Sequence, residues 1–248
     1  MKIVLIASKQ DTAGMNIAKH CEDLGFKVNY IEEKQIFAKN LDDFDADLII
    51  ILSKHKSESG KLTLTAHHPG NFSKDTSHGG NSKELSVAYP SYHKEIIRQL
   101  HNIKNEVPDF QITTEPTHHG PTSFKTPVIF VEIGSTDKEW KNQKAGESVA
   151  KALKTAMEVS PKHPKTAIAI GGGHYSEKFT GILLNSEYAI GHICPKYAID
   201  HLDIEALRQM KERSAEKITF ALIDKKGVKS KTKLISMCTE LGLKVVQV

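Results

Sequence analysis

The segment DLIIILS at residues 47–53 decides the fold class of this chain. Its five consecutive apolar residues, Leu48 to Leu52, leave neither face of a strand polar. A strand that is apolar on both faces is typical of a parallel sheet that helices cover on both sides. The segment KIVLIAS at residues 2–8 has the same character, so both segments are predicted to be buried strands.

A helix and another strand fit between these two segments. Asp11 or Thr12 can cap a helix that Gly25 ends, and residues 26–31 follow as a strand. Strands that alternate with helices are typical of βαβ units. The chain is therefore predicted to be an α/β protein with a mixed, largely parallel sheet flanked by helices and with long functional loops.

The remaining sequence continues this alternation after a less regular stretch. Between about residues 54 and 126 the periodicity is weak, and it indicates only a strand at 61–66, a helix from Pro90 and a strand at 109–114. Further strands are predicted at 127–133, 165–170, 188–193, 217–223 and 243–248, and further helices at 136–157, 178–185, 203–213 and 228–241. Because no linker divides the chain, we predict one domain, 1–248, with a loop-rich insertion at about 54–126.

The composition is that of an ordinary soluble globular protein. Of the 248 residues, 39% are hydrophobic and 26% are charged. No apolar run approaches the ~18 residues of a membrane-spanning helix. The three cysteines have no metal-finger spacing, which favours a reducing cytoplasm. A net charge of +4 fits an RNA substrate without requiring one.

Histidine is concentrated in the irregular part of the chain. Eight of the 13 histidines lie between His55 and His119, in phrases rich in Ser, Gly, Asn and Pro. Histidine changes charge near neutral pH and ligates metals, while Gly and Pro fix the conformation of loops. The combination predicts one polar site assembled from several loops, at the carboxyl edge of a sheet, and therefore an enzyme.

One histidine pair lies in EPTHHGPT at residues 115–122. Neighbouring residues on an extended segment point to opposite sides. One ring of His118 and His119 would then enter the site while the other holds the loop. The alternative is a surface loop with two solvated histidines.

Two further phrases follow or end predicted strands. In LTAHHPGN at residues 64–71, a Pro-Gly turn fixes the histidine pair relative to the strand before it. In SKHKSESG at residues 53–60, lysines could attract phosphate and serines could hydrogen-bond it. Each phrase could equally be a solvated turn or loop. The candidate ligand- or substrate-binding residues in the two phrases are Lys54, His55, Lys56, Ser57, His67 and Asn71.

A glycine triplet opens GGGHYSEKFT at residues 171–180. Gly171, Gly172 and Gly173 would let backbone N–H groups approach an oxyanion or a phosphate, and His174 and Tyr175 follow directly. The phrase contains neither GK[ST] nor GxGxxG, so a nucleotide cofactor is not supported. The alternative is a glycine turn that allows close packing.

Glu132 lies inside the strand phrase FVEIGS. A buried carboxylate is costly unless it has a partner, so Glu132 could orient a histidine, bind a metal or act as a base. It could also only satisfy backbone amides. The chain contains no GxSxG and no HExxH, but dispersed histidines could still hold zinc for hydrolysis.

Six phrases taken together resemble one family. They are SKHKSESG, LTAHHPGN, THHGPT, FVEIGST with the later Trp140, GGGHYSEKFT and GHICPKYA. In this order they resemble the D-aminoacyl-tRNA deacylases of the archaeal and plant type, the second deacylase family. The resemblance implies a fold like that of peptidyl-tRNA hydrolase and the phosphorylase/hydrolase-like α/β proteins, and a Zn²⁺ cofactor. It also implies hydrolysis of the ester between a D-amino acid and the 3′ end of tRNA.

This reaction assigns the candidate residues to three roles. The catalytic candidates are His118, His119, Glu132 and His174. The metal candidates are His67, His118, His119 and His174. The substrate-binding candidates are Lys54, His55, Lys56, Ser57, Asn71, Gly171, Gly172, Gly173 and Tyr175.

The resemblance also implies a partner, and it leaves other functions open. The partner would be the aminoacylated acceptor end of tRNA, bound by a monomeric cytoplasmic chain with no membrane association. The alternatives are a zinc peptidase, a nucleoside phosphorylase-like enzyme, and a non-catalytic module that binds the acceptor end of tRNA.

Overall fold

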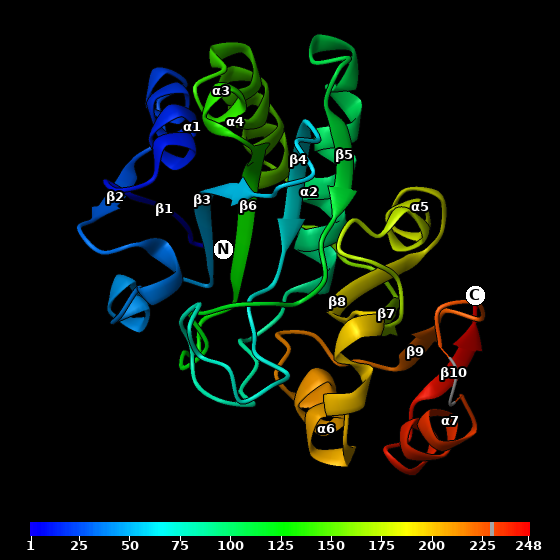
Figure 1. Cartoon of the computed structure of the whole chain (residues 1–248). Coiled ribbons are helices and arrows are strands. Elements are labelled where there is room, and N and C mark those ends of the chain that lie inside the picture. The colour runs from blue at the N-terminus through cyan, green and yellow to red at the C-terminus, as the bar shows by residue number, and fades with distance from the viewer. Residues whose placement is uncertain (229–230) are drawn as a thin grey trace.

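A computed structural model describes residues 1–228 and 231–248 and contains two β-sheets (Figure 1). The first sheet has the order β2-β1-β3-β6-β4-β5, with β1 Ile3–Ser8, β2 Val28–Ile31, β3 Leu48–Lys56, β4 Thr63–His67, β5 Gln111–Thr114 and β6 Val128–Ser135. The second has the order β10-β9-β7-β8, with β7 Lys165–Ile170, β8 Tyr188–Cys194, β9 Phe220–Ile223 and β10 Lys244–Gln247.

Most neighbouring strands run parallel. In the first sheet only the pairing of β4 with β6 is antiparallel, and in the second sheet all pairings among the described residues are parallel. The predicted α/β fold with mixed, largely parallel strands is therefore confirmed. The sequence pattern did not separate the strands into two sheets.

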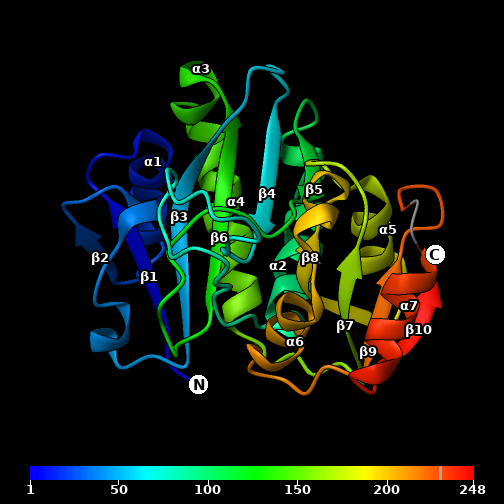
Figure 2. The same cartoon turned by 60° about the horizontal axis from the view of Figure 1, so that its bottom comes forward.

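Helices cover one face of the first sheet and join the two sheets (Figure 2). The helices are α1 Thr12–Asp23, α2 Pro90–Asn102, α3 Asp137–Trp140, α4 Gln143–Met157, α5 Glu177–Asn185, α6 Ile204–Glu212 and α7 Lys231–Glu240. Helix α2 contacts β4 and β5 of the first sheet and β8 of the second, so it fills the junction between them. Of the helix predicted over 228–241, residues 229 and 230 lie outside the described residues. No described helix is long and apolar enough to cross a bilayer.

The segment that decided the fold class is buried on both faces, as predicted. Leu48, Ile50 and Leu52 pack in a core cluster with residues of α1, α2 and α4. Ile49 and Ile51 pack on the opposite face in a second cluster. The first of these clusters also contains residues of β7 and β8, so the two sheets share one continuous apolar core.

Strand β3 is longer than predicted. The first part of SKHKSESG continues the strand to Lys56 instead of forming a loop. The cause is its pairing with β6, which matches Ser53 with Glu132 and His55 with Gly134. This extension fixes His55 on a strand. The strand predicted at 61–66 is β4, shifted so that His67 ends it.

The helix predicted over 136–157 is divided in two. The capping box of Thr136 and Glu139 is present, but α3 ends at Trp140 and α4 begins at Gln143. The Asn142 side chain accepts a hydrogen bond from the Ala145 N–H and so caps a new helix. The Asn16 side chain donates to the carbonyl oxygens of Trp140 and Asn142 and so holds the junction between the two helices.

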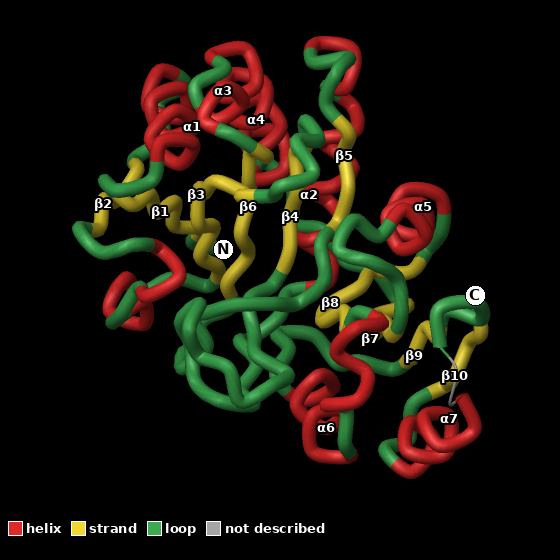
Figure 3. Tube along the Cα trace, in the orientation of Figure 1, coloured by secondary structure: helices red, strands yellow, loops and turns green. Residues whose placement is uncertain are grey.

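Long loops cover the other face of the first sheet. Figure 3 shows the loops that follow β4 and β5 gathered beside the sheet, and in Figure 2 they cross in front of β3, β6 and β4. LTAHHPGN and EPTHHGPT lie in these loops or at the strand ends that lead into them, whereas SKHKSESG ends β3 and GGGHYSEKFT follows β7. The fold therefore brings them to one place.

Close packing of α1 on β3 predicts opposite effects for two glycine substitutions. A Cβ on Gly14 would lie 2.4 Å from the backbone oxygen of Leu52, which cannot move aside, whereas a Cβ on Gly181 of α5 would meet nothing within 4 Å. We expect Gly14→Ala to lower the free energy of unfolding by about 1–3 kcal/mol. Gly181→Ala should raise it by roughly 0.5–1 kcal/mol, because alanine favours the helix. Urea unfolding of both variants measures this; equal effects would contradict the packing.

Candidate active site

Strand register places a row of polar side chains on the face of the first sheet opposite α1 and α4. Side chains alternate between the faces of a strand, so Leu64 and Ala66 enter the core while Thr65 and His67 point to the other face. Thr65 pairs with Glu132 across β4 and β6. These polar side chains therefore lie on a face of the sheet and not only at the carboxyl edge where the sequence pattern predicts the site. The reason is that β4 is antiparallel to β6, so the carboxyl ends of these two strands point in opposite directions.

A buried carboxylate, Glu115, lies at the centre of this region. It directly follows β5 and is 1% exposed. Its oxygens lie 3.2 Å from His55 Nδ1, 3.2 Å from His174 Nε2 and 3.5 Å from His118 Nε2. Burial alone would raise the pKa of Glu115, but the facing imidazoles of His174 and His55 hold this pKa well below its usual range. The carboxylate therefore stays negatively charged.

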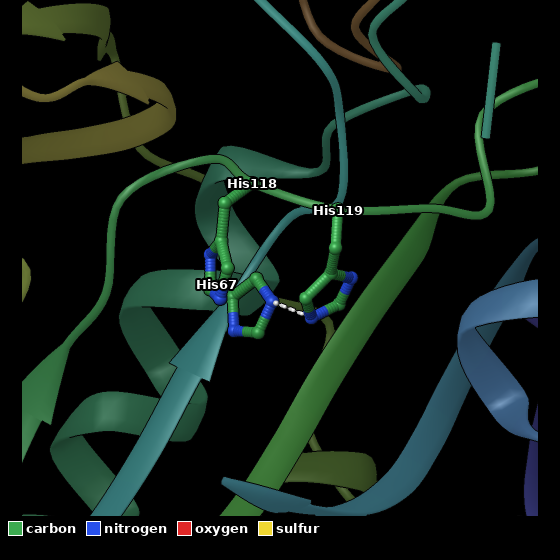
Figure 4. A group of neighbouring side chains, drawn as sticks. All are labelled: His67, His118 and His119. Atoms are coloured by element: carbon green, nitrogen blue, oxygen red, sulfur yellow. Dashed lines mark hydrogen bonds between the residues drawn. The ribbon is translucent and has the colours of Figure 1, made fainter. Parts of the chain in front are cut away.

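The rings of His67, His118 and His119 meet at one place, as Figure 4 shows. The Nε2 atoms of His67 and His119 are 3.2 Å apart, and the ring centroids of His118 and His119 are 4.4 Å apart. His119 has a φ of 48°, a left-handed conformation that breaks the alternation of an extended segment. The expectation that the two neighbouring rings point to opposite sides is therefore wrong, since both lie beside His67.

The hydrogen bonds of His118 and His119 leave both Nε2 atoms as lone-pair donors. His118 Nδ1 lies 2.8 Å from the carbonyl oxygen of Pro116, and His119 Nδ1 lies 2.6 Å from that of Gly120. A carbonyl can only accept, so each Nδ1 carries the proton. This is the arrangement that orients metal-ligating histidines. Burial also lowers the pKa of His118 to about 4, which keeps that ring neutral.

The residues of this cluster fit a zinc ion. The ligand atoms of His67, His118 and His119 lie within 4.8 Å of one another. Two ligands of a tetrahedral zinc ion are about 3.3 Å apart when each bond is about 2.05 Å, close to the 3.2 Å between His67 and His119. The His118 lone pair also faces the Glu115 carboxylate at 3.5 Å, and neither oxygen of Glu115 accepts a well-aligned hydrogen bond from the described residues. The His118 nitrogen and the Glu115 oxygens face one another with lone pairs on both sides, and a cation between them would stabilise this arrangement.

Glu132 and His55 form the neighbouring wall. Glu132 Oε2 lies 3.6 Å from His55 Nδ1. Burial, helped by the charge of Glu115, raises the pKa of Glu132 to about 7 despite His55. Burial would lower the pKa of His55, but the two carboxylates outweigh it and raise this pKa to about 11. The Glu132 carboxyl group thus lies beside a positively charged imidazole.

These groups line or underlie a cavity of about 950 Å³. Of the predicted site residues, the cavity is lined by Lys54, His55, Lys56, Ser57, Asn71, His118, His119, Glu132 and His174. His67 is fully buried beneath them. The Tyr175 ring lies 5.5 Å from the rings of both His55 and His174. The fold thus brings most of the predicted residues together.

The glycine triplet does not line this cavity. The N–H of Gly171 donates to the carbonyl oxygen of Cys194. A Cβ on Gly171 would lie 2.5 Å from Asp224, and one on Gly172 would lie 2.6 Å from Ser176 Oγ. These contacts favour the close-packing alternative for Gly171 and Gly172, and the role of the triplet in substrate binding stays a prediction.

Comparison with known proteins identifies the family. The family model described as D-aminoacyl-tRNA deacylase matches residues 42–246. The chain belongs to the D-aminoacyl-tRNA deacylase family. The D-aminoacyl-tRNA deacylase of Ignicoccus hospitalis is 39% identical over 100% of both chains, and that of Methanococcus vannielii is 37% identical over 95% of this chain and 94% of its own. A crystal structure of a conserved protein of unknown function is 29% identical, covers 99% of this chain and 95% of its own, and superposes with a TM-score of 0.93.

Sequence reasoning missed the residue at the centre of this deacylase-family site. Glu115 is the first residue of EPTHHGPT and directly follows a predicted strand, which is the same position that drew attention to the other site residues. Tyr197, which also lines the cavity, was missed as well. Its signal was weak, because one tyrosine after a strand has no characteristic spacing.

A second histidine cluster joins the two sheets instead of lining the cavity. His93 Nδ1 lies 2.8 Å from the carbonyl oxygen of Ile190, and His68 accepts from the N–H of Tyr89. His192 Nε2 donates to the Ser86 carbonyl oxygen, while its Nδ1 lies 3.1 Å from Thr117 Oγ1. Each ring has partners on both nitrogens, so these histidines are structural.

Acid should destabilise the fold through this cluster. Burial lowers the pKa of His192 to about 4 in the folded chain, against about 6.5 when unfolded. The unfolded chain therefore binds the proton more readily, and the stabilisation present above pH 6.5 is lost as the pH falls toward 4. For His192 this is about 3 kcal/mol. Urea unfolding from pH 7 to 4 should show a shallower decline in His192→Asn than in the wild type; identical slopes would contradict this assignment.

Proposed function

We propose that the chain hydrolyses the ester that links a D-amino acid to the 3′ end of tRNA, which frees the tRNA for reuse. Membership of the deacylase family over most of the chain supports this activity. The observation that carries the proposal is the cavity that has Glu115, Glu132 and the histidines His55, His67, His118, His119 and His174 on its wall or floor. The net charge of +4 favours a polyanionic substrate.

We propose a zinc ion as the cofactor, held by His67, His118 and His119. Their neutral rings and the facing Glu115 carboxylate support this choice over a hard cation, which would prefer oxygen ligands. A bound zinc ion supplies Lewis acidity that polarises a carbonyl oxygen. His174 remains a further candidate ligand or proton donor, since it lies beside Glu115 and lines the cavity.

The chain's own residues would position the substrate and move the protons. Glu132 lines the cavity and can take a proton from the water that attacks the ester carbon, while His55 keeps the carboxylate oriented. His174, at the cavity wall, can deliver a proton to the departing ribose oxygen. Lys54 and Lys56 would attract the phosphates of the acceptor end, and Ser57 would hydrogen-bond them.

We further propose that residues 1–248 act as one monomeric unit in the cytoplasm. The cavity takes lining residues from β3 and β6 and also from His174 and Tyr197, which follow strands of the second sheet. Neither sheet alone would complete it. The tRNA acceptor end is the expected partner, and translation places that substrate in the cytoplasm.

Release of tyrosine from charged tRNA tests the proposal. We expect D-tyrosyl-tRNA to be hydrolysed at least about 100-fold faster than L-tyrosyl-tRNA, and we expect a chelator to abolish release until zinc is restored. Equal release of both enantiomers would contradict the chiral activity. Full activity of chelator-treated protein shown to be free of metal would contradict the cofactor.

Metal content of two matched variants locates the ion. His119→Ala should lose zinc after dialysis, whereas His101→Ala, on the exposed side of α2, should keep the wild-type content. Zinc retained by His119→Ala would remove His119 from the ligand set.

A further inference from the structure

Tyr197 is unusually exposed for a large aromatic side chain beside a buried polar site. It lies on the 3-10 helix Lys196–His201, directly after β8, and is 58% exposed. It also lines the cavity that holds His118, His119 and Glu132. An aromatic ring that is left open to solvent at the wall of a cavity is available to a ligand.

The surroundings of Tyr197 hold its ring in place. The N–H of Lys196 donates to the carbonyl oxygen of Gly172, which fixes the start of the short helix against the glycine loop. The Tyr197 hydroxyl lies 3.4 Å from His174 Nδ1, and His174 Nε2 lies 3.2 Å from Glu115. One imidazole therefore separates the exposed ring from the centre of the site.

The cavity is larger than an amino acid requires. Pockets that enclose drug-sized ligands have volumes of about 300–1,000 Å³, and this cavity has about 950 Å³. An amino acid ester bound beside His118 and Glu132 would leave room for the ribose and base to which it is attached. Because the ribose separates base and ester, the base would lie away from the buried centre, toward the exposed wall.

We propose that Tyr197 is the platform on which the terminal nucleobase of the RNA stacks. This inference rests on the proposed function, because it assigns a binding site to part of the same substrate. Proteins recognise unpaired RNA ends by stacking their bases on aromatic side chains. Stacking on Tyr197 would hold the attached ester near His174 and Glu115.

Three lysines on the cavity wall suit an RNA end as the occupant. Lys34, Lys54 and Lys56 line the cavity, as do the carboxylates Glu58, Asp75 and Glu132. No carboxylate of the described residues lies within 4.0 Å of the three ammonium groups, and Lys54 Nζ lies 5.1 Å from the centre of the Trp140 ring. Ammonium groups that have no carboxylate partner suit the phosphate that precedes a stacked base.

The test compares binding of two uncharged tRNAs, one complete and one lacking its terminal adenosine. The wild type should bind the complete tRNA about 5- to 100-fold more tightly, as measured by fluorescence anisotropy. Tyr197→Ala should abolish this ratio, and Tyr197→Phe should restore it because the ring is kept. Phe37→Ala removes a comparably exposed aromatic side chain that does not line the cavity and should keep the wild-type ratio.

Two results would overturn the proposal. One is a wild-type protein that binds the two tRNAs equally; the other is a Tyr197→Ala variant that keeps the wild-type ratio, whether or not both tRNAs bind more weakly, which would mean that the ring does not contact the terminal base. Deacylation of D-tyrosyl-tRNA by the wild-type preparation is measured alongside. Deacylation with an unchanged ratio in Tyr197→Ala overturns only the stacking site, whereas absent deacylation overturns the proposed function.

Discussion

The site depends on one buried negative charge, the carboxylate of Glu115. Its position after β5 places it against the end of β4, and three histidine rings from separate parts of the chain approach it within 3.5 Å. An isolated carboxylate buried this deeply would cost several kcal/mol. The histidines offset that cost, so the charge that would destabilise the core instead brings His55, His118 and His174 together.

The fold was predictable to the extent that burial leaves a pattern in the sequence. DLIIILS and KIVLIAS have the pattern of strands buried on both faces, and of the two predicted caps, Asp11 and Thr12, it is Asp11 that caps α1. The split into two sheets was not predictable, because strand order depends on long-range pairing that no local pattern records. The same is true of β4, whose antiparallel pairing with β6 brings His67 beside Phe130.

The sequence predicted which segments contribute to the candidate site, but not how their side chains are arranged in space. Glycine, proline and histidine in one loop identify a shaped polar segment, and most of the predicted residues do line one cavity. The sequence did not predict which histidine rings lie together. The positive φ of His119 turns its side chain to a different side from the one that the alternation of an extended segment predicts. His68 follows His67 in the same phrase, yet it bonds backbone groups at the sheet junction together with His93 of α2.

The most direct test of this account is the deacylation rate of Glu115→Gln, an isosteric change that removes the charge. The account predicts a folded protein that loses zinc and at least about 100-fold of its activity on D-tyrosyl-tRNA, because the histidines no longer face an anion. A Glu115→Gln variant with wild-type zinc content and rate would contradict the claim that this carboxylate organises the site.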